Sequence, residues 1–155
     1  MAITFNPLGL FIGRVSANVE VLLAPHHSLI VSPNVLAFPE GRGGRYNVFN
    51  EGLGLATNSS TGFGGELGYH YWWRWRRTLS GPFIGPSFLA GSVTNAAVGP
   101  TNTAQAYWGL ALDAGGQAVL PGGFTLGGGL GIGFVDMRGA TAAFPRVLLQ
   151  IGWSF

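Results

Sequence analysis

Charged residues are scarce in this chain of 155 residues. Only 9% are charged, eight basic and six acidic, whereas an average soluble domain carries roughly 25%. So low a content argues against a disordered chain, a helical bundle held together by salt bridges, and a nucleic-acid-binding protein built on a basic patch. It predicts that much of the outer surface does not face water.

Long apolar runs and cysteines are also missing. A membrane-spanning helix needs about 18 or more consecutive apolar residues, and the best candidate segments are interrupted by Arg14, Asp113 and Gln150. The absence of cysteine excludes disulfides, thiolate metal sites and thiol catalysis. The first residues show neither a basic region nor a small-residue cleavage site, so we expect no signal peptide here and interpret the sequence as a mature form.

The sequence does contain a regular alternation of polar and apolar residues. Between residues 105 and 118, the polar side chains Gln105, Asp113 and Gln117 share one face, and Trp108 and Leu110 lie on the other. A period of two is typical of β-strands. Turn-forming segments such as 24–28 and 121–123 separate the alternating stretches. We therefore expect eight strands, at 8–23, 28–38, 45–56, 62–73, 82–93, 104–120, 124–135 and 144–155.

The third of these segments, 45–56, is the least regular. We count it because single-chain bacterial barrels have an even number of strands, with both termini on the periplasmic side. The polar face of the strands holds mostly small residues and the other face is rich in aromatics, which favours lipid outside and polar side chains inside. The predicted fold is all-β: a single-chain, antiparallel, up-and-down transmembrane β-barrel of eight strands, forming one domain over residues 1–155.

The expected interior holds most of the charges on the strands. An eight-stranded barrel is only wide enough for side chains to fill, and opposite charges confined there must pair because isolated buried charge is expensive. We therefore predict a polar network that plugs the barrel, with a narrow ion or water path as the alternative. The glycines at 127, 129, 131 and 133 leave space, so a small cavity is expected beside their strand. The network residues are Arg14, Glu20, Glu66, His70, Asp113 and Arg146.

Aromatic residues gather where strands meet turns. Tyrosine and tryptophan favour membrane interfaces, where the ring sits among lipid headgroups and its polar atom stays wet. The arginines at 74, 76 and 77 would lie just beyond such a girdle, among phosphates. The expected interface aromatics are Tyr69, Tyr71, Trp73, Trp75, Trp108 and Trp153.

The last strand, 148–155, carries Ile151, Trp153 and Phe155 in alternation. It resembles the C-terminal insertion signal of bacterial outer-membrane barrels, although Gln150 stands where that pattern usually has glycine. Strand-and-glycine stretches at 6–10, 62–69, 81–86, 107–112 and 123–133 extend the likeness to small eight-stranded outer-membrane barrels of OmpA/OmpX-like architecture, and among them to a poorly characterised bacterial group. The resemblance implies a monomer integral to the outer membrane of a Gram-negative bacterium, in contact with membrane lipid and with the outer-membrane assembly machinery.

The remaining chemistry is sparse, and we expect a structural or membrane-stabilising protein that is not an enzyme. One alternative is a lipid-active outer-membrane hydrolase or acyltransferase, for which His70, Glu66, Ser87 and Asp113 supply candidate parts. The Gly-x-Ser-x-Gly nucleophile motif is absent, however. A third reading is a soluble lipocalin-like carrier with an apolar interior.

Ligands other than lipid have little support in the sequence. We expect no metal, because the adjacent residues His26 and His27 point their rings apart and have no nearby carboxylate. We expect no cofactor, because the glycines of 127–133 do not fit a nucleotide-binding motif. One isolated cluster of aromatics and arginines is not enough to predict binding to nucleic acid.

Overall fold

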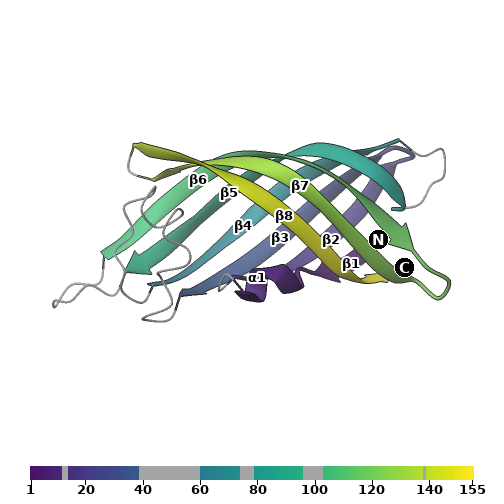
Figure 1. The fold of residues 1–155 in the computed structure, drawn as a ribbon, viewed down its shortest axis with the longest axis horizontal. Coiled ribbons are helices and arrows are strands. Elements are labelled where there is room, and N and C mark those ends of the chain that lie inside the picture. Colours follow the sequence, from purple (N-terminus) through teal and green to yellow (C-terminus); the bar gives the residue numbers. More distant parts are fainter. Residues whose placement is uncertain (12–13, 39–59, 74–78, 96–102, 138) are drawn as a thin grey trace.

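The computed structural model describes residues 1–11, 14–38, 60–73, 79–95, 103–137 and 139–155. They form a closed barrel of eight antiparallel strands, in which each strand pairs with its neighbours in chain order and β1 pairs with β8 (Figure 1). The predicted all-β, up-and-down architecture is therefore confirmed. The elements are β1 (Ala2–Phe5), α1 (Pro7–Phe11), β2 (Arg14–Ala24), β3 (His27–Phe38), β4 (Ser60–Trp72), β5 (Gly81–Asn95), β6 (Thr103–Val119), β7 (Phe124–Met137) and β8 (Ala140–Ser154).

The first expected strand, 8–23, is wrong in its first part. Residues Pro7–Phe11 form the short helix α1, and the strand begins only at Arg14. Asn6 and Pro7 explain the helix locally. The side chain of Asn6 accepts a hydrogen bond from the Leu8 N–H at 3.1 Å, and proline at the first helical position already has a helical φ. A separate strand, β1, precedes this helix and was not among the predicted segments. The barrel has eight strands, as predicted, and β1 is one of them. Segment 45–56 lies outside the described residues.

Both termini lie at one end of the barrel (Figure 1). The Met1 ammonium donates to the Phe155 carbonyl at 3.0 Å, and the Phe155 N–H donates to the Met1 carbonyl at 2.8 Å. The turn between β6 and β7 lies at the same end, where Gly122 and Gly123 adopt φ of +87° and +88°. We call this the terminal end and the opposite one the loop end.

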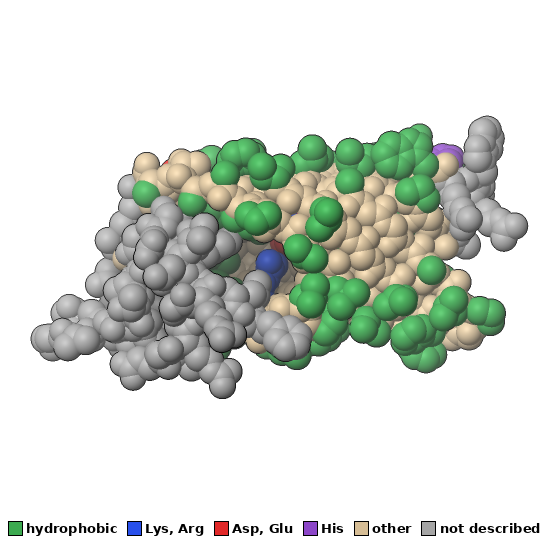
Figure 2. Space-filling view, in the orientation of Figure 1, with side chains coloured by type: hydrophobic (Ala, Val, Ile, Leu, Met, Phe, Trp, Pro, Cys, Tyr) green, Lys and Arg blue, Asp and Glu red, His purple; other side chains and the backbone are tan. Residues whose placement is uncertain are grey.

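The two faces of the wall differ in polarity. Along β6, Asp113 is 2% exposed and Leu112, next to it, is 50% exposed. The same alternation places polar side chains inside and large apolar ones outside on the other strands, and Figure 2 shows apolar side chains spread along the outer surface. Within the described parts of the chain, no helix is long and apolar enough to cross a membrane.

The interior is filled in layers. At the loop end, Val93, Val135 and Met137 form a buried apolar cluster, with Tyr107 and Phe144 packed against it. The charged residues follow in the middle of the barrel. Toward the terminal end lies a second apolar cluster, formed by Ala2, Trp72, Leu79 and Phe83.

Candidate functional site: the barrel interior

A layer of four charged side chains occupies the middle of the barrel. Glu66 on β4 accepts hydrogen bonds from two arginines, from Arg146 on β8 at 2.7 Å and from Arg14 on β2 at 3.4 Å. Arg146 also faces Asp113 on β6, with 3.1 Å between Nε and Oδ1, at an angle outside hydrogen-bond geometry. We call these four residues the charged layer. Its two positive and two negative charges balance, which offsets the cost of holding them away from water.

A second polar group lies between the charged layer and the terminal end. One carboxylate oxygen of Glu20, Oε1, accepts from the Ser28 hydroxyl at 2.5 Å and lies 2.9 Å from His70 Nδ1. Trp72 donates its indole N–H to Ser28 at 2.8 Å. The imidazole of His70 stacks on Phe83, with ring centroids 4.2 Å apart. We call these five residues the aromatic layer.

The six residues expected in an interior polar network all point into the barrel, but they form two groups. Glu66, Asp113, Arg146 and Arg14 meet in the charged layer, whereas Glu20 and His70 belong to the aromatic layer. Five of the six are buried, and Arg14 is the exception, with 24% of its side chain exposed.

The parts named for a hydrolase do not form a nucleophile–base–acid relay in this geometry. Such a relay needs the imidazole between the hydroxyl and the carboxylate. Of the residues named for a hydrolase, His70 contacts the carboxylate of Glu20 at 2.9 Å and not the hydroxyl of Ser87. Ser87 lies 3.5 Å from Asp113, and Ser28 and Ser87 are buried in the wall with 0% and 3% exposure.

The expected interface aromatics lie on the outer face where they are described. Tyr69, Tyr71 and Trp73 lie near the terminal end of β4, and Trp108 lies toward the loop end of β6. Trp153 donates its indole N–H to the Gly122 carbonyl at 2.7 Å. Trp75 and the arginines at 74, 76 and 77 lie outside the described residues.

The residues proposed as an insertion signal lie on one face of β8 and directly after its last residue. Ile151, Trp153 and Phe155 are all exposed on the outside. In the closed barrel their strand pairs with β7 on one side and, over Ile151–Ser154, with β1 on the other. Their recognition by assembly machinery stays a prediction.

The two histidines at the turn between β2 and β3 each contact a residue of β4. The His26 imidazole lies 2.7 Å from the Trp72 carbonyl, and that of His27 contacts the Tyr69 hydroxyl. The described residues contain no cluster of three or more side chains suited to a metal ion.

The prediction of a cavity beside the glycines of β7 is wrong at Gly131 and Gly133, because neighbouring side chains fill the space there. A Cβ on Gly131 would lie 2.0 Å from the Asp113 carboxylate, and one on Gly133 would lie 2.4 Å from the Phe144 ring.

Three members of the aromatic layer were missed by the sequence reasoning. Ser28, Trp72 and Phe83 were not named as interior residues, yet each is almost fully buried. The signal was available for Trp72, because it lies two positions from His70 and so shares the inward face of the same strand.

Comparison with known proteins adds no relative to this description: no family model, no curated protein and no solved structure matches the chain.

Proposed function

We propose that this protein is an integral β-barrel of a bacterial outer membrane, a monomer with a plugged polar interior that serves a structural or membrane-stabilising role and catalyses no reaction. The observation that carries the proposal is the inverted polarity of the wall. Buried polar and charged residues line the inside, and large apolar side chains cover the outside. A protein in water needs the opposite arrangement, and a transmembrane barrel needs this one.

Backbone chemistry supports the same proposal. In lipid every N–H and C=O needs an internal partner, and a closed barrel supplies such partners through its inter-strand hydrogen bonds. The strands are paired around the whole circumference at the terminal end. A lipocalin-like carrier would instead need an apolar cavity, whereas the middle of this barrel holds two ion-paired arginines.

The plug is favoured over a channel by the layers. The charged layer lies between an apolar cluster toward the loop end and another toward the terminal end. Eight strands leave an interior that side chains can fill. In planar bilayers we expect no steady stepwise conductance, and its appearance would overturn the plug.

Tryptophan fluorescence in brominated lipid tests the membrane proposal. Two single-tryptophan variants report on opposite faces of the wall: one retains only Trp108, 52% exposed outside, and the other retains only Trp72, 1% exposed inside. The other tryptophans are replaced by phenylalanine in each. In phosphatidylcholine vesicles we expect bromines on the acyl chains to quench Trp108 strongly and Trp72 little.

Trp72 is the matched control because it lies in the same wall and faces inward. Folding of both variants is checked by gel migration, where a closed barrel and a boiled chain run at different positions. A folded protein whose Trp108 is quenched no more than Trp72, or that is a monodisperse monomer without detergent, would contradict the membrane proposal.

A further inference from the structure

The hydrogen-bonded wall has a gap on one side. Strand β1 is four residues long, and it pairs with β8 only over Ile151–Ser154 and with β2 only over Ala17–Glu20. Among the described residues, no strand pairs with the free edge of β8 over Ala140–Gln150 or with that of β2 over Arg14–Ser16. The gap therefore lies between β2 and β8, toward the loop end.

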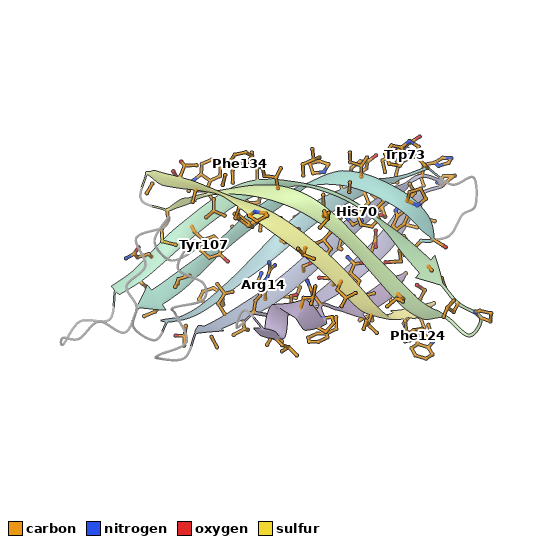
Figure 3. The ribbon with its side chains drawn as sticks, in the orientation of Figure 1. Arg14, His70, Trp73, Tyr107, Phe124 and Phe134 are labelled. Carbon is orange, nitrogen blue, oxygen red and sulfur yellow. The ribbon has the colours of Figure 1, made fainter. Side chains whose placement is uncertain are left out.

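Helix α1 lies beside this gap and contacts both β2 and β8 (Figure 1). It packs closely on β2, since a Cβ on Gly9 would lie 2.4 Å from the Arg14 carbonyl oxygen. The helix covers the gap only in part. Figure 2 shows the wall hollowed here, with basic and acidic side-chain atoms visible in the hollow, and Figure 3 labels Arg14 at this place.

Arg14 is the less constrained of the two arginines in the charged layer. Arg146 is 8% exposed and binds Glu66 at 2.7 Å. Among the described residues, Arg14 donates a single hydrogen bond, to Glu66 at 3.4 Å, and 24% of its side chain is exposed. A guanidinium has five N–H donors in a planar fork that fits a carboxylate. Arg14 therefore has donors to spare at an opening in the wall.

The outer surface around the opening is apolar and suits the hydrocarbon part of a ligand whose polar headgroup binds Arg14. Leu10, Val15 and Val147 are large apolar residues of α1, β2 and β8, and each is about half exposed on the outside. Non-helical backbone at membrane depth is tolerated where it is covered by protein or lines a polar, hydrated space. The gap thus joins an apolar outer surface to a guanidinium just inside it.

The charge of the layer limits the charge of the headgroup. The charged layer is neutral without a ligand, because Arg14 and Arg146 offset Glu66 and Asp113. Among anionic headgroups, one with a single negative charge is therefore repelled less by the two carboxylates than one with two. A carboxylate can also accept two parallel hydrogen bonds from one edge of the guanidinium.

We propose that the opening between β2 and β8 is a lateral binding site for a long-chain fatty acid, whose carboxylate binds Arg14 while its acyl chain lies against the outer wall in the bilayer. The site rests on the proposed membrane location, because the chain must approach from lipid. It adds a ligand class to a barrel whose interior holds an apolar cluster toward each end.

Electron paramagnetic resonance with nitroxide-labelled stearate tests this site. The barrel is reconstituted in phosphatidylcholine vesicles, and stearate labelled near its carboxylate is titrated in parallel with its uncharged methyl ester. We expect an immobilised spectral component that saturates at about one stearate per barrel, as a single guanidinium fork allows. The methyl ester should give no saturable component.

The variant Arg14→Gln should bind stearate about tenfold more weakly, which corresponds to losing roughly 1.4 kcal/mol of charge-assisted hydrogen bonding. Arg76→Gln is the control, because it removes the same charge from a position four residues beyond β4. Saturable binding that is equal for the methyl ester, or unchanged by Arg14→Gln, would overturn the site. So would a preference for labelled phosphatidylglycerol, which would assign the opening to phospholipid headgroups.

Two measurements keep the outcomes distinct. If Arg14→Gln fails to fold on a gel, the comparison of stearate with its methyl ester on the unmodified chain still decides the proposal. Quenching of Trp108 by brominated lipid in the same vesicles reports on the membrane location alone. Quenched Trp108 without saturable stearate binding would reject only the fatty-acid site, and unquenched Trp108 would reject the membrane proposal.

Discussion

The charged layer and the aromatic layer fill the same narrow barrel with different chemistry. In the charged layer, four strands each contribute one acidic or basic side chain, and Glu66 on β4 joins an arginine from β2 to another from β8. In the aromatic layer, Phe83 and the ring of Trp72 occupy most of the volume, and one carboxylate, Glu20, accepts from its neighbours. Removing a side chain should therefore destabilise the barrel for a different reason in each layer.

A buried ion pair contributes little net stability but is costly to break. Its attraction mainly offsets the cost of taking the charges out of water, whereas removing one partner leaves the other charge buried and unpaired. A packed aromatic ring costs contact area and leaves a cavity when it is lost. We therefore expect a loss of charge to destabilise the charged layer even when side-chain volume is kept. In the aromatic layer, we expect a loss of volume to be destabilising even when charge is kept.

The largest effect is expected from Glu66→Ala. Both arginines lose their shared carboxylate, so we expect the free energy of unfolding to fall by about 4 kcal/mol, within the range for breaking a buried ion pair. Urea unfolding in lipid vesicles, followed by gel migration, measures the change. Ser32→Ala is the control, because Ser32 is buried opposite Glu66 in the register of β3 and β4. Equal losses in the two variants would contradict an electrostatic origin.

Phe83→Ala should come next, at about 3 kcal/mol, the order of cost for truncating a buried phenylalanine. The ring is 2% exposed and contacts the rings of both His70 and Trp72. Phe88, on the outer face of the same strand, is the matched control. If Phe88→Ala destabilised the barrel as much as Phe83→Ala, the packing of the aromatic layer would not explain the effect.

A double-mutant cycle separates charge from volume in the charged layer. Glu66→Gln leaves Arg14 without its negatively charged partner, and Arg14→Gln removes the positive charge that needs one. We expect the double variant to lose about 1–2 kcal/mol less than the sum of the single variants, as for contacting residues in one network. The same unfolding measurement applies to all three variants. Strict additivity would show that Arg14 and Glu66 do not interact.

The two layers also differ in how far the sequence predicts them. Alternation places Glu66 and Asp113 on the inner face, because a strand has only two faces. It also places Trp72 there. Because tryptophan is common at membrane interfaces, however, only its exposed neighbour Trp73 was assigned a place, at the interface. Pairing was not predictable: Glu66 meets Arg146 across 80 positions of the chain, and that contact depends on the stagger between strands.

The ends of the elements show a further limit of the pattern. The alternation is clear only from Arg14 onward, so extending the first strand back to Leu8 was wrong, because Asn6 and Pro7 start helix α1 there. The four residues of β1 were too few to show a period. The glycines of β7 suggested empty space, yet Asp113 and Phe144 from neighbouring strands lean over them. A sequence shows which residue lacks a side chain, but only the register shows which side chain fills the place.

The smallest effect is expected from Trp72→Phe, which keeps an aromatic ring in the aromatic layer and removes one donor. The indole N–H of Trp72 binds the Ser28 hydroxyl, and Ser28 in turn donates to Glu20. Losing that bond and part of the ring should cost about 1–2 kcal/mol, since a net hydrogen bond contributes about 1 kcal/mol. Trp153→Phe is the control: its indole N–H also donates a single hydrogen bond, to the Gly122 carbonyl, but the residue lies exposed at the outer surface, so we expect a smaller loss there. A larger loss from the exposed substitution than from the buried one would contradict a stabilising role for the hydrogen bond between Trp72 and Ser28.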